Sequence, residues 1–318
     1  MDEFGLIETF FKRGPQSSRV VLGVGDDAAL IEGPAGQTYV LTTDTLVTGV
    51  HFPDGAPGFD VGYKALAVNV SDLAAMGARP LGFLLNLTLP AVDEAWLAGL
   101  RDGLFALSEG LAMDLIGGDT VRGPLSVTIT AIGLVPEGGA LRRAGARVGD
   151  QIYVSGFLGE AALGFLARSG QVKVPEEFMA RVLGRLDRPR PRIAEGEALR
   201  TIASAAIDLS DGLVADLGHI LRASGVGAQI DLRRLPVSDA YDAVFSTLGY
   251  DPALGFGDDY ELCFTVPPER LTAFHRILPR FDCGFHYIGD IVAGEALVLR
   301  TETGVYVPKA LGFNHFRG

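Results

Sequence analysis

The sequence predicts an α/β protein of two domains, with strands and helices alternating through both halves. The chain has 318 residues, which is more than a single hydrophobic core usually supports. Apolar runs bounded by glycine predict strands, and stretches with apolar residues every three or four positions predict helices between them. A segment rich in glycine and arginine at 138–150 interrupts this alternation. It predicts a boundary between domains at 1–137 and 138–318.

The first half alternates in a simple order. Helical spacing at 3–13 predicts a first helix, which Gly14 and Pro15 end. Strands are expected at 20–25, 28–33, 38–47, 82–90, 114–120 and 125–135, with a glycine turn ending the fifth. Two long helices are expected at 60–77 and 92–113, and Asp93 suits the N-cap of the second.

The second half continues the alternation. The segment 204–227 predicts a strand, a turn and a helix closed by glycine. Further strands are expected at 151–156, 227–232, 260–266, 285–291 and 296–300, and further helices at 159–170, 239–249 and 268–278. The stretch RPRPR at 188–192 predicts a stiff connector on the surface. Alternation in both halves favours two α/β layers.

The charge of the chain limits its partners. A formal net charge of −12 argues against nucleic acid or an anionic membrane as the main partner. Lysine is rare and occurs only at Lys12, Lys64, Lys173 and Lys309. A phosphate site in this chain would therefore depend on arginine, backbone N–H groups or metal ions. Divalent cations reconcile an acidic protein with an anionic ligand, because they bridge carboxylate to phosphate.

The cysteines and the apolar runs indicate a compartment. Cys263 and Cys283 have neither metal nor redox spacing, which is typical of proteins in a reducing cytoplasm. No apolar run reaches membrane-spanning length, and the acidic first residues lack the basic region of a secretory signal. We therefore expect a cytoplasmic protein.

Aspartates recur in one setting, after an apolar strand-like run and beside Gly, Ser or Thr. They are Asp26, Asp27, Asp44, Asp119, Asp208, Asp211, Asp258 and Asp259. Asp72 lies instead on the helix expected at 60–77, on the face that carries Val68. Each aspartate taken alone is well explained as a turn former or N-cap. Their repetition at strand ends, where ligand clefts of α/β sheets form, favours a common site.

Clustered carboxylates repel one another unless cations neutralise them. The sequence has no Cys or His set with zinc spacing, and hard oxygen donors favour Mg²⁺. Thr42 and Thr43, beside Asp44, add neutral oxygen ligands. Mg²⁺ held by carboxylates and completed by water and phosphate oxygens is common at nucleotide sites. The sequence therefore predicts a nucleotide site that uses Mg²⁺.

Common nucleotide-binding motifs are missing. The sequence has no GxxxxGK[ST] and no HRD or DFG, which excludes P-loop and protein-kinase folds. GVGDDA places aspartate where a dinucleotide fold needs room for pyrophosphate. The helix start at 210–212 could offer N–H groups to an anion. Arg142 and Arg143 are either an arginine clamp or solvent-facing residues.

Six motifs in this order resemble the thiamine-monophosphate kinase family, in the superfamily of aminoimidazole ribonucleotide synthetase and selenophosphate synthetase. They are GVGDDAAL, LTTDTLVTGVHF, YKALAVNVSDLAAMGARP, IGGDT with RGP, AIDLSDGLVADLGHI and GDDYELCF. The similarity runs from about Phe4 to the terminal GFNHF. It implies ATP-dependent phosphorylation of thiamine monophosphate to thiamine diphosphate. It also implies an N-terminal α/β domain whose sheet pairs across a homodimer, and a C-terminal α/β domain. ATP is expected in the cleft between the two domains.

The resemblance also assigns residues. The positions that match Mg²⁺ ligands of the family are Asp27, Thr42, Thr43, Asp44, Asp72, Asp119, Asp208 and Asp211. Those that match nucleotide contacts are Gly118, Asp119, Arg143 and Ser210. Those that match substrate contacts are His51, Asp258 and Phe313. Relatives commonly have Glu at the position of Asp258, and Phe313 lacks the polar group that some relatives offer, which leaves stacking as its role. Asp26 matches no ligand and is expected to shape its turn.

The acceptor of such a reaction is already an anionic phosphate. We therefore expect direct in-line transfer that depends on alignment and charge neutralisation, with no protein base. For His51, a substrate hydrogen bond or simple packing is favoured over a role as base. Two alternatives remain open: another ATP-using member of the superfamily with a different acceptor, and a non-catalytic nucleotide- or metal-binding regulator. A selenium acceptor is disfavoured because no cysteine precedes Cys263.

Overall fold

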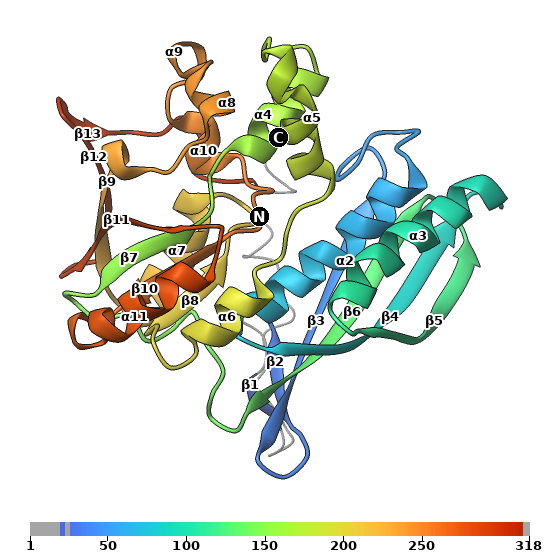
Figure 1. Cartoon of the computed structure of the whole chain (residues 1–318), viewed down its shortest axis with the longest axis horizontal. Coiled ribbons are helices and arrows are strands. Elements are labelled where there is room, and N and C mark those ends of the chain that lie inside the picture. Colours follow the sequence, from blue (N-terminus) through green and yellow to red (C-terminus); the bar gives the residue numbers. More distant parts are fainter. Residues whose placement is uncertain (1–19, 23–25, 314–318) are drawn as a thin grey trace.

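The computed structural model describes residues 20–22 and 26–313 and contains two separate β-sheets with helices packed against them (Figure 1). The two-domain mixed α/β architecture predicted from the sequence is confirmed. The helix expected at 3–13 lies outside the described residues. In the part of the chain that is described, no helix is both long and apolar enough to cross a bilayer.

The first sheet has six strands in the order β1-β2-β3-β6-β4-β5. Their bounds are β1 Val20–Leu22, β2 Ala29–Glu32, β3 Gln37–Val47, β4 Arg79–Leu89, β5 Asp114–Arg122 and β6 Ser126–Pro136. Of these pairs only β4 and β5 run parallel. On β6, Val127, Ile129 and Ala131 are buried and alternate with half-buried residues. One face of this sheet therefore carries the hydrophobic core.

Two helices, α2 Gly58–Ala75 and α3 Glu94–Gly110, pack together beside this sheet (Figure 1). They approach closely, because a Cβ added at Gly103 would lie 1.9 Å from the carbonyl oxygen of Phe59. Asp93 caps α3 as predicted, since its Oδ1 accepts the N–H groups of Ala95 and Trp96 at 3.0 and 3.1 Å.

The second sheet has seven strands in the order β13-β12-β9-β11-β7-β10-β8. Their bounds are β7 Gln151–Ser155, β8 Ala205–Asp208, β9 Gly227–Asp231, β10 Leu262–Val266, β11 Phe285–Val292, β12 Leu297–Thr301 and β13 Gly304–Tyr306. Within this second sheet, β9 and β12 are the only parallel pair among the described strands. The helices are α4 Glu160–Arg168, α5 Glu176–Asp187, α6 Ile193–Leu199, α7 Leu213–Ser224, α8 Asp239–Asp242, α9 Phe245–Leu248, α10 Asp251–Gly255 and α11 Leu271–Ile277. Single 3-10 turns lie at Leu232–Arg234, Pro268–Arg270 and Leu278–Arg280.

Helix α2 joins the two halves. It contacts β3 and β6 of the first sheet and also α6 and β8 of the second half. The approach to α6 is close, because a Cβ added at Gly196 would lie 2.0 Å from the carbonyl oxygen of Ala74. Fourteen of the eighteen residues of α2 are buried, so this helix has partners on almost every side.

Two local expectations are wrong. Asp44 and Asp119 do not follow a strand but lie inside β3 and β5, and β5 continues through Gly117 and Gly118 where a turn is expected. Both sheets are largely antiparallel, so the aspartates do not share the carboxyl edge of a parallel sheet. The stretch 137–150 contains no helix or strand and connects the sheets; the boundary at 138 stays a prediction.

Candidate active site between the two halves

A cavity of about 930 Å³ opens between the two halves of the molecule. Its walls come from β3, the turn that follows it, α2, α4, the end of β8, the loop before β10 and the chain around Phe313. Twelve residues singled out from the sequence line it, namely Asp27, Thr42, Thr43, Asp44, His51, Asp72, Arg143, Asp208, Ser210, Asp211, Asp258 and Phe313.

Gly118 and Asp119 are the two assigned residues that do not line this cavity. Both lie on β5, and the strands β6 and β4 separate β5 from β3. Three strand spacings amount to about 14 Å. Their predicted contacts with nucleotide and metal therefore have no support from the cavity.

Three of the carboxylates that line the cavity lie close together. Asp27, Asp72 and Asp208 each offer an oxygen, and these oxygens lie within 4.8 Å of one another. Burial, and then the neighbouring Asp27, raises the pKa of Asp208 to about 8. Burial, and then Asp44 and Asp208, raises the pKa of Asp72 well above its ordinary value. A divalent cation would relieve this repulsion, because it favours the charged form of all three carboxylates.

Hydroxyl groups orient two of these carboxylates. Thr42 Oγ1 donates to Asp72 Oδ2 at 2.5 Å, and Ser71 Oγ donates to Asp208 Oδ2 at 2.6 Å. The Oδ2 of Asp27 is buried and has no hydrogen-bond partner among the described residues. Since a buried carboxylate oxygen normally finds a partner, the cluster fits a bound metal ion. The donor set consists of hard oxygens, which suits Mg²⁺.

Arg143 bonds to the adjacent aspartates Asp26 and Asp27. Its Nε donates to Asp27 Oδ1 at 3.0 Å, and its backbone N–H lies 3.3 Å from both carboxylate oxygens of Asp26. Asp26 also accepts the N–H of Asp27 at 3.0 Å. Asp26 therefore bonds within its turn and Asp27 lines the cavity, while the expected role of Asp27 as a metal ligand stays a prediction.

His51 lies in the turn after β3, at the cavity. Its Nδ1 accepts the backbone N–H of Val47 at 3.0 Å. A ring that accepts through Nδ1 carries no proton there, so in this arrangement the imidazole is neutral with its proton on Nε2.

The loop that precedes β10 has an unusual backbone. Asp258 and Tyr260 have positive φ angles of 62° and 49°, which side-chain-bearing residues seldom adopt. The Asp258 N–H donates to the carbonyl of Ser210 at 2.8 Å, and the Tyr260 N–H donates to that of Leu209 at 2.9 Å. These bonds tie the loop to the end of β8, beside Asp208.

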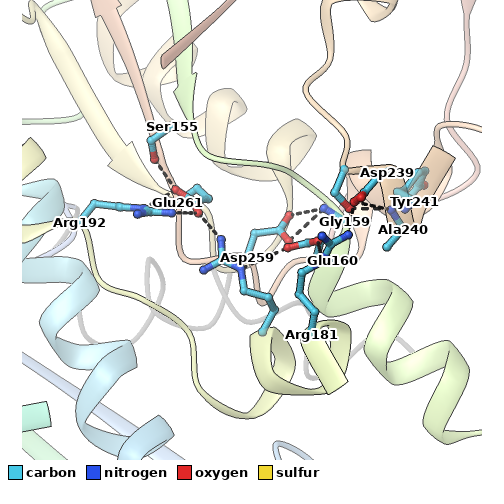
Figure 2. A network of polar contacts seen from close by, with 12 residues as sticks. Ser155, Gly159, Glu160, Arg181, Arg192, Asp239, Ala240, Tyr241, Asp259 and Glu261 are labelled. Atoms are coloured by element: carbon cyan, nitrogen blue, oxygen red, sulfur yellow. Dashed lines mark hydrogen bonds and ion pairs between the residues drawn. The ribbon is translucent and has the colours of Figure 1, made fainter. Parts of the chain in front are cut away.

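A buried polar network fixes the far side of this loop (Figure 2). Glu261 is fully buried and accepts from Ser155 Oγ at 2.5 Å, Arg185 Nη2 at 2.6 Å and Arg192 Nε at 2.6 Å. Asp259 accepts the backbone N–H of Gly159 at 3.0 Å. Arg192 therefore turns inward, and the expectation that 188–192 is only a surface connector is wrong for this residue.

Replacing Asp259 with asparagine should flatten the pH dependence of stability. Burial raises the pKa of Asp259 to about 8 from an ordinary value of 3.8. Between these values the folded state holds a proton that the unfolded chain releases, so rising pH lowers the free energy of unfolding. Thermal melts of metal-free protein at pH 5 and pH 8 measure this. The difference in Tm between the two pH values should be smaller for Asp259→Asn than for wild type; an equal difference contradicts the assignment.

Part of the cavity wall is aromatic. Phe165 of α4 and Phe256 lie with ring centroids 5.1 Å apart, and Phe313 also lines the cavity with its side chain half exposed. The Phe313 N–H donates to the carbonyl of Asp211 at 3.0 Å, which anchors it beside the acidic cluster. Phe165 and Phe256 are not among the site residues predicted from the sequence. An apolar residue that lines a cavity has the same sequence pattern as one in the hydrophobic core.

The cavity thus has acidic and aromatic side chains in its walls, and both α/β halves contribute residues to it. Residues 25–135 match the model of the AIR synthase related protein N-terminal domain, and residues 147–302 match that of the C-terminal domain. The protein is therefore an AIR synthase related protein.

Individual relatives show to which family of AIR synthase related proteins the chain belongs. The chain is 52% identical over 296 residues to thiamine-monophosphate kinase of Salmonella typhimurium strain LT2, covering 92% of this chain and 90% of the relative. It is 49% identical over 320 residues to that of Escherichia coli K12, covering 99% and 98%. The chain belongs to the thiamine-monophosphate kinase family.

Solved structures agree with this family. The thiamine-monophosphate kinase from Stenotrophomonas maltophilia K279a superposes with a TM-score of 0.80 at 44% identity, covering 96% of this chain and 98% of that chain. The structure described as AaThiL complexed with AMPPCP and TMP superposes with a TM-score of 0.86 at 32% identity, covering 99% and 97%.

Proposed function

We propose that this chain transfers the terminal phosphoryl group of ATP to thiamine monophosphate and so forms thiamine diphosphate. The observation that carries this proposal is one cavity whose acidic side chains suit metal-bound phosphates and whose aromatic side chains suit a flat heterocycle. Membership of the thiamine-monophosphate kinase family supports it. The complex of AaThiL with AMPPCP and TMP shows that a protein of this fold holds both kinds of ligand.

The residues would act as follows. Asp27, Asp72 and Asp208 would hold Mg²⁺, with Asp44, Asp211 and the hydroxyls of Thr42 and Thr43 beside them. Bound Mg²⁺ supplies charge neutralisation between these carboxylates and the phosphate oxygens. Arg143 and Ser210 would contact the nucleotide, while His51, Asp258 and Phe313 would contact the acceptor. Gly118 and Asp119 stay predicted contacts, because they lie on β5 outside the cavity.

The transfer itself needs alignment more than proton removal. An oxygen of the acceptor phosphate forms a bond to the γ-phosphorus, the bond to the bridging β–γ oxygen breaks, and ADP leaves. The acceptor oxygen already carries negative charge, so no protein base is required. The neutral His51 ring, held through Nδ1, suits a hydrogen bond to substrate. The side chains of the cavity would hold the reacting groups in line.

A coupled assay of ADP release tests the proposal. The purified chain receives ATP, Mg²⁺ and, separately, thiamine monophosphate, thiamine or an aminoimidazole precursor. We expect turnover with thiamine monophosphate alone and loss of turnover with a chelator. Turnover with the imidazole precursor would indicate a different acceptor, and nucleotide binding without ADP release would indicate a regulator.

The cytoplasmic location expected from the cysteines stays a prediction.

The chain is also proposed to form a homodimer through its first sheet. Strand β5 is an edge strand whose nine residues are all exposed, including Leu115, Ile116 and Val121. An exposed apolar edge strand is a ready surface for pairing with another chain.

A single charge on β5 should therefore separate the protomers. We expect wild-type protein to sediment as a dimer and Val121→Asp to shift toward monomer, because an unpaired carboxylate would be buried in the interface. Val92→Asp is the matched control, since Val92 is also exposed but lies before α3. Sedimentation velocity measures the result, and a dimer that persists in Val121→Asp would exclude this strand.

A further inference from the structure

Lys64 is a buried cation that the sequence analysis did not place in the site. It is one of four lysines in the chain, and its side chain is only 5% exposed. Lysine is almost never buried without a partner. Here Nζ donates to Asp258 Oδ2 at 2.8 Å, across 194 positions of sequence.

The position of Lys64 on α2 links it to the active site. Lys64, Val68 and Asp72 follow one another at intervals of four residues and so lie along one face of the helix. Val68 and Asp72 both line the cavity. The face of α2 that carries Asp72 therefore also carries Lys64, two helical turns earlier. From there Lys64 reaches Asp258 in the other half of the molecule.

Asp258 needs such a partner. It lines the cavity, its side chain is 29% exposed, and its backbone has a φ of 62°. A left-handed backbone is unfavourable for a residue with a Cβ and persists only where surrounding contacts hold it. The Ser210 carbonyl holds the backbone of Asp258, and Lys64 holds its carboxylate.

We propose that Lys64 is a positioning residue that fixes the Asp258 carboxylate, and with it the loop before β10, where Asp258 lines the cavity and would contact the acceptor. The proposal rests on the proposed function, in which Asp258 contacts thiamine monophosphate. Lys64 itself does not line the cavity. It acts through an ion pair between α2 and the second half of the molecule.

Kinetics of Lys64→Met test this role. The substitution removes the charge-assisted hydrogen bond from Lys64 to Asp258, and the buried site leaves little room for a water molecule to replace it. KM for thiamine monophosphate should therefore rise by about tenfold or more. KM for ATP should stay within about twofold, because Arg143 and the carboxylate cluster are unchanged. In an Asp258→Asn background, Lys64→Met should add less than about threefold, because residues that act through one contact are not additive. Arg101→Met is the control, since Arg101 pairs with Asp102 on the exposed face of α3.

A second measurement does not depend on the substrate. Hydrogen exchange followed by mass spectrometry should show faster exchange of the amides in 257–261 in Lys64→Met and unchanged exchange in Arg101→Met. Should Lys64→Met fail to fold, Lys64→Gln keeps an N–H donor and takes its place in both measurements, with smaller changes in the same direction.

The outcomes separate the two proposals. Unchanged exchange in a folded Lys64 variant overturns the positioning role whatever the acceptor. Equal rises in KM for both reactants, or effects that multiply in the double variant, overturn it as well. Wild-type protein that does not phosphorylate thiamine monophosphate overturns the proposed function instead, while faster exchange would still support the link between Lys64 and the loop.

Discussion

Replacing Asp72 with asparagine is expected to lower the rate of phosphoryl transfer on the order of a thousandfold, the scale on which single electrostatic groups act in active sites. Asp72 shares a cluster with Asp27 and Asp208, whose oxygens lie within 4.8 Å of its own. Asp72 is a proposed ligand for Mg²⁺, and a neutral amide at this position would hold the metal more weakly. Steady-state rates of ADP release at saturating ATP and Mg²⁺ measure the effect.

The same substitution should not destabilise the metal-free protein. Burial and the carboxylates of Asp44 and Asp208 raise the pKa of Asp72, which shows that its charge is unfavourable there. Asparagine retains an oxygen that can accept from Thr42. We expect a Tm without metal that equals or exceeds that of wild type, and a smaller gain in Tm on addition of Mg²⁺.

Asp102→Asn is the matched control for Asp72→Asn, because Asp102 is an exposed aspartate on α3. It should leave both the rate and the Tm unchanged. An Asp72→Asn protein with a nearly wild-type rate, or with an undiminished response to Mg²⁺, would rule out Asp72 as a metal ligand.

Replacing Glu261 with alanine is expected to lower the free energy of unfolding by about 3–5 kcal/mol, the range measured when one partner of a buried ion pair is removed. Glu261 is fully buried and accepts from Ser155, Arg185 and Arg192. Without it, the guanidinium groups of Arg185 and Arg192 keep only their longer contacts, to Glu160 at 3.4 Å and to Glu195 at 3.9 Å. Figure 2 shows Glu261 beside Ser155 and Arg192 within this network.

Urea unfolding of Glu261→Ala and Asp102→Ala compares a buried with an exposed ion pair. Asp102 pairs with Arg101, and both side chains are more than half exposed, so its loss should cost less than about 1 kcal/mol. A similarly small loss for Glu261→Ala would show that the network contributes little to stability, and a changed m-value would indicate partial unfolding instead of a uniform loss.

The sequence predicted the chemistry of the site better than its geometry. The aspartates, the threonines beside Asp44 and the absence of zinc spacing are local features, so they could be read directly. Their grouping could not be read in the same way. Asp27, Asp72 and Asp208 meet because α2 packs against both halves, which is a contact between distant parts of the chain.

Some elements differ from expectation for a related reason. Helices α5 and α6 are not among the expected elements, and Arg192 turns inward to Glu261 where the arginine–proline stretch suggests solvent. A basic connector is ordinary on a surface. Arg192 turns inward here only because it pairs with the buried carboxylate of Glu261, the residue before β10. No local pattern around 188–192 contains that information.

The sequence by itself determined the fold class, the acidic character of the site and the resemblance to a kinase family, because these depend on residue type and on spacing along the chain. Only the tertiary structure decided that Asp44 and Asp119 lie within strands of one largely antiparallel sheet, that Asp119 does not line the cavity, and that Lys64 reaches Asp258. The reason is physical: strand order and helix packing are set by burial of apolar surface summed over the whole chain, and no short segment carries that sum.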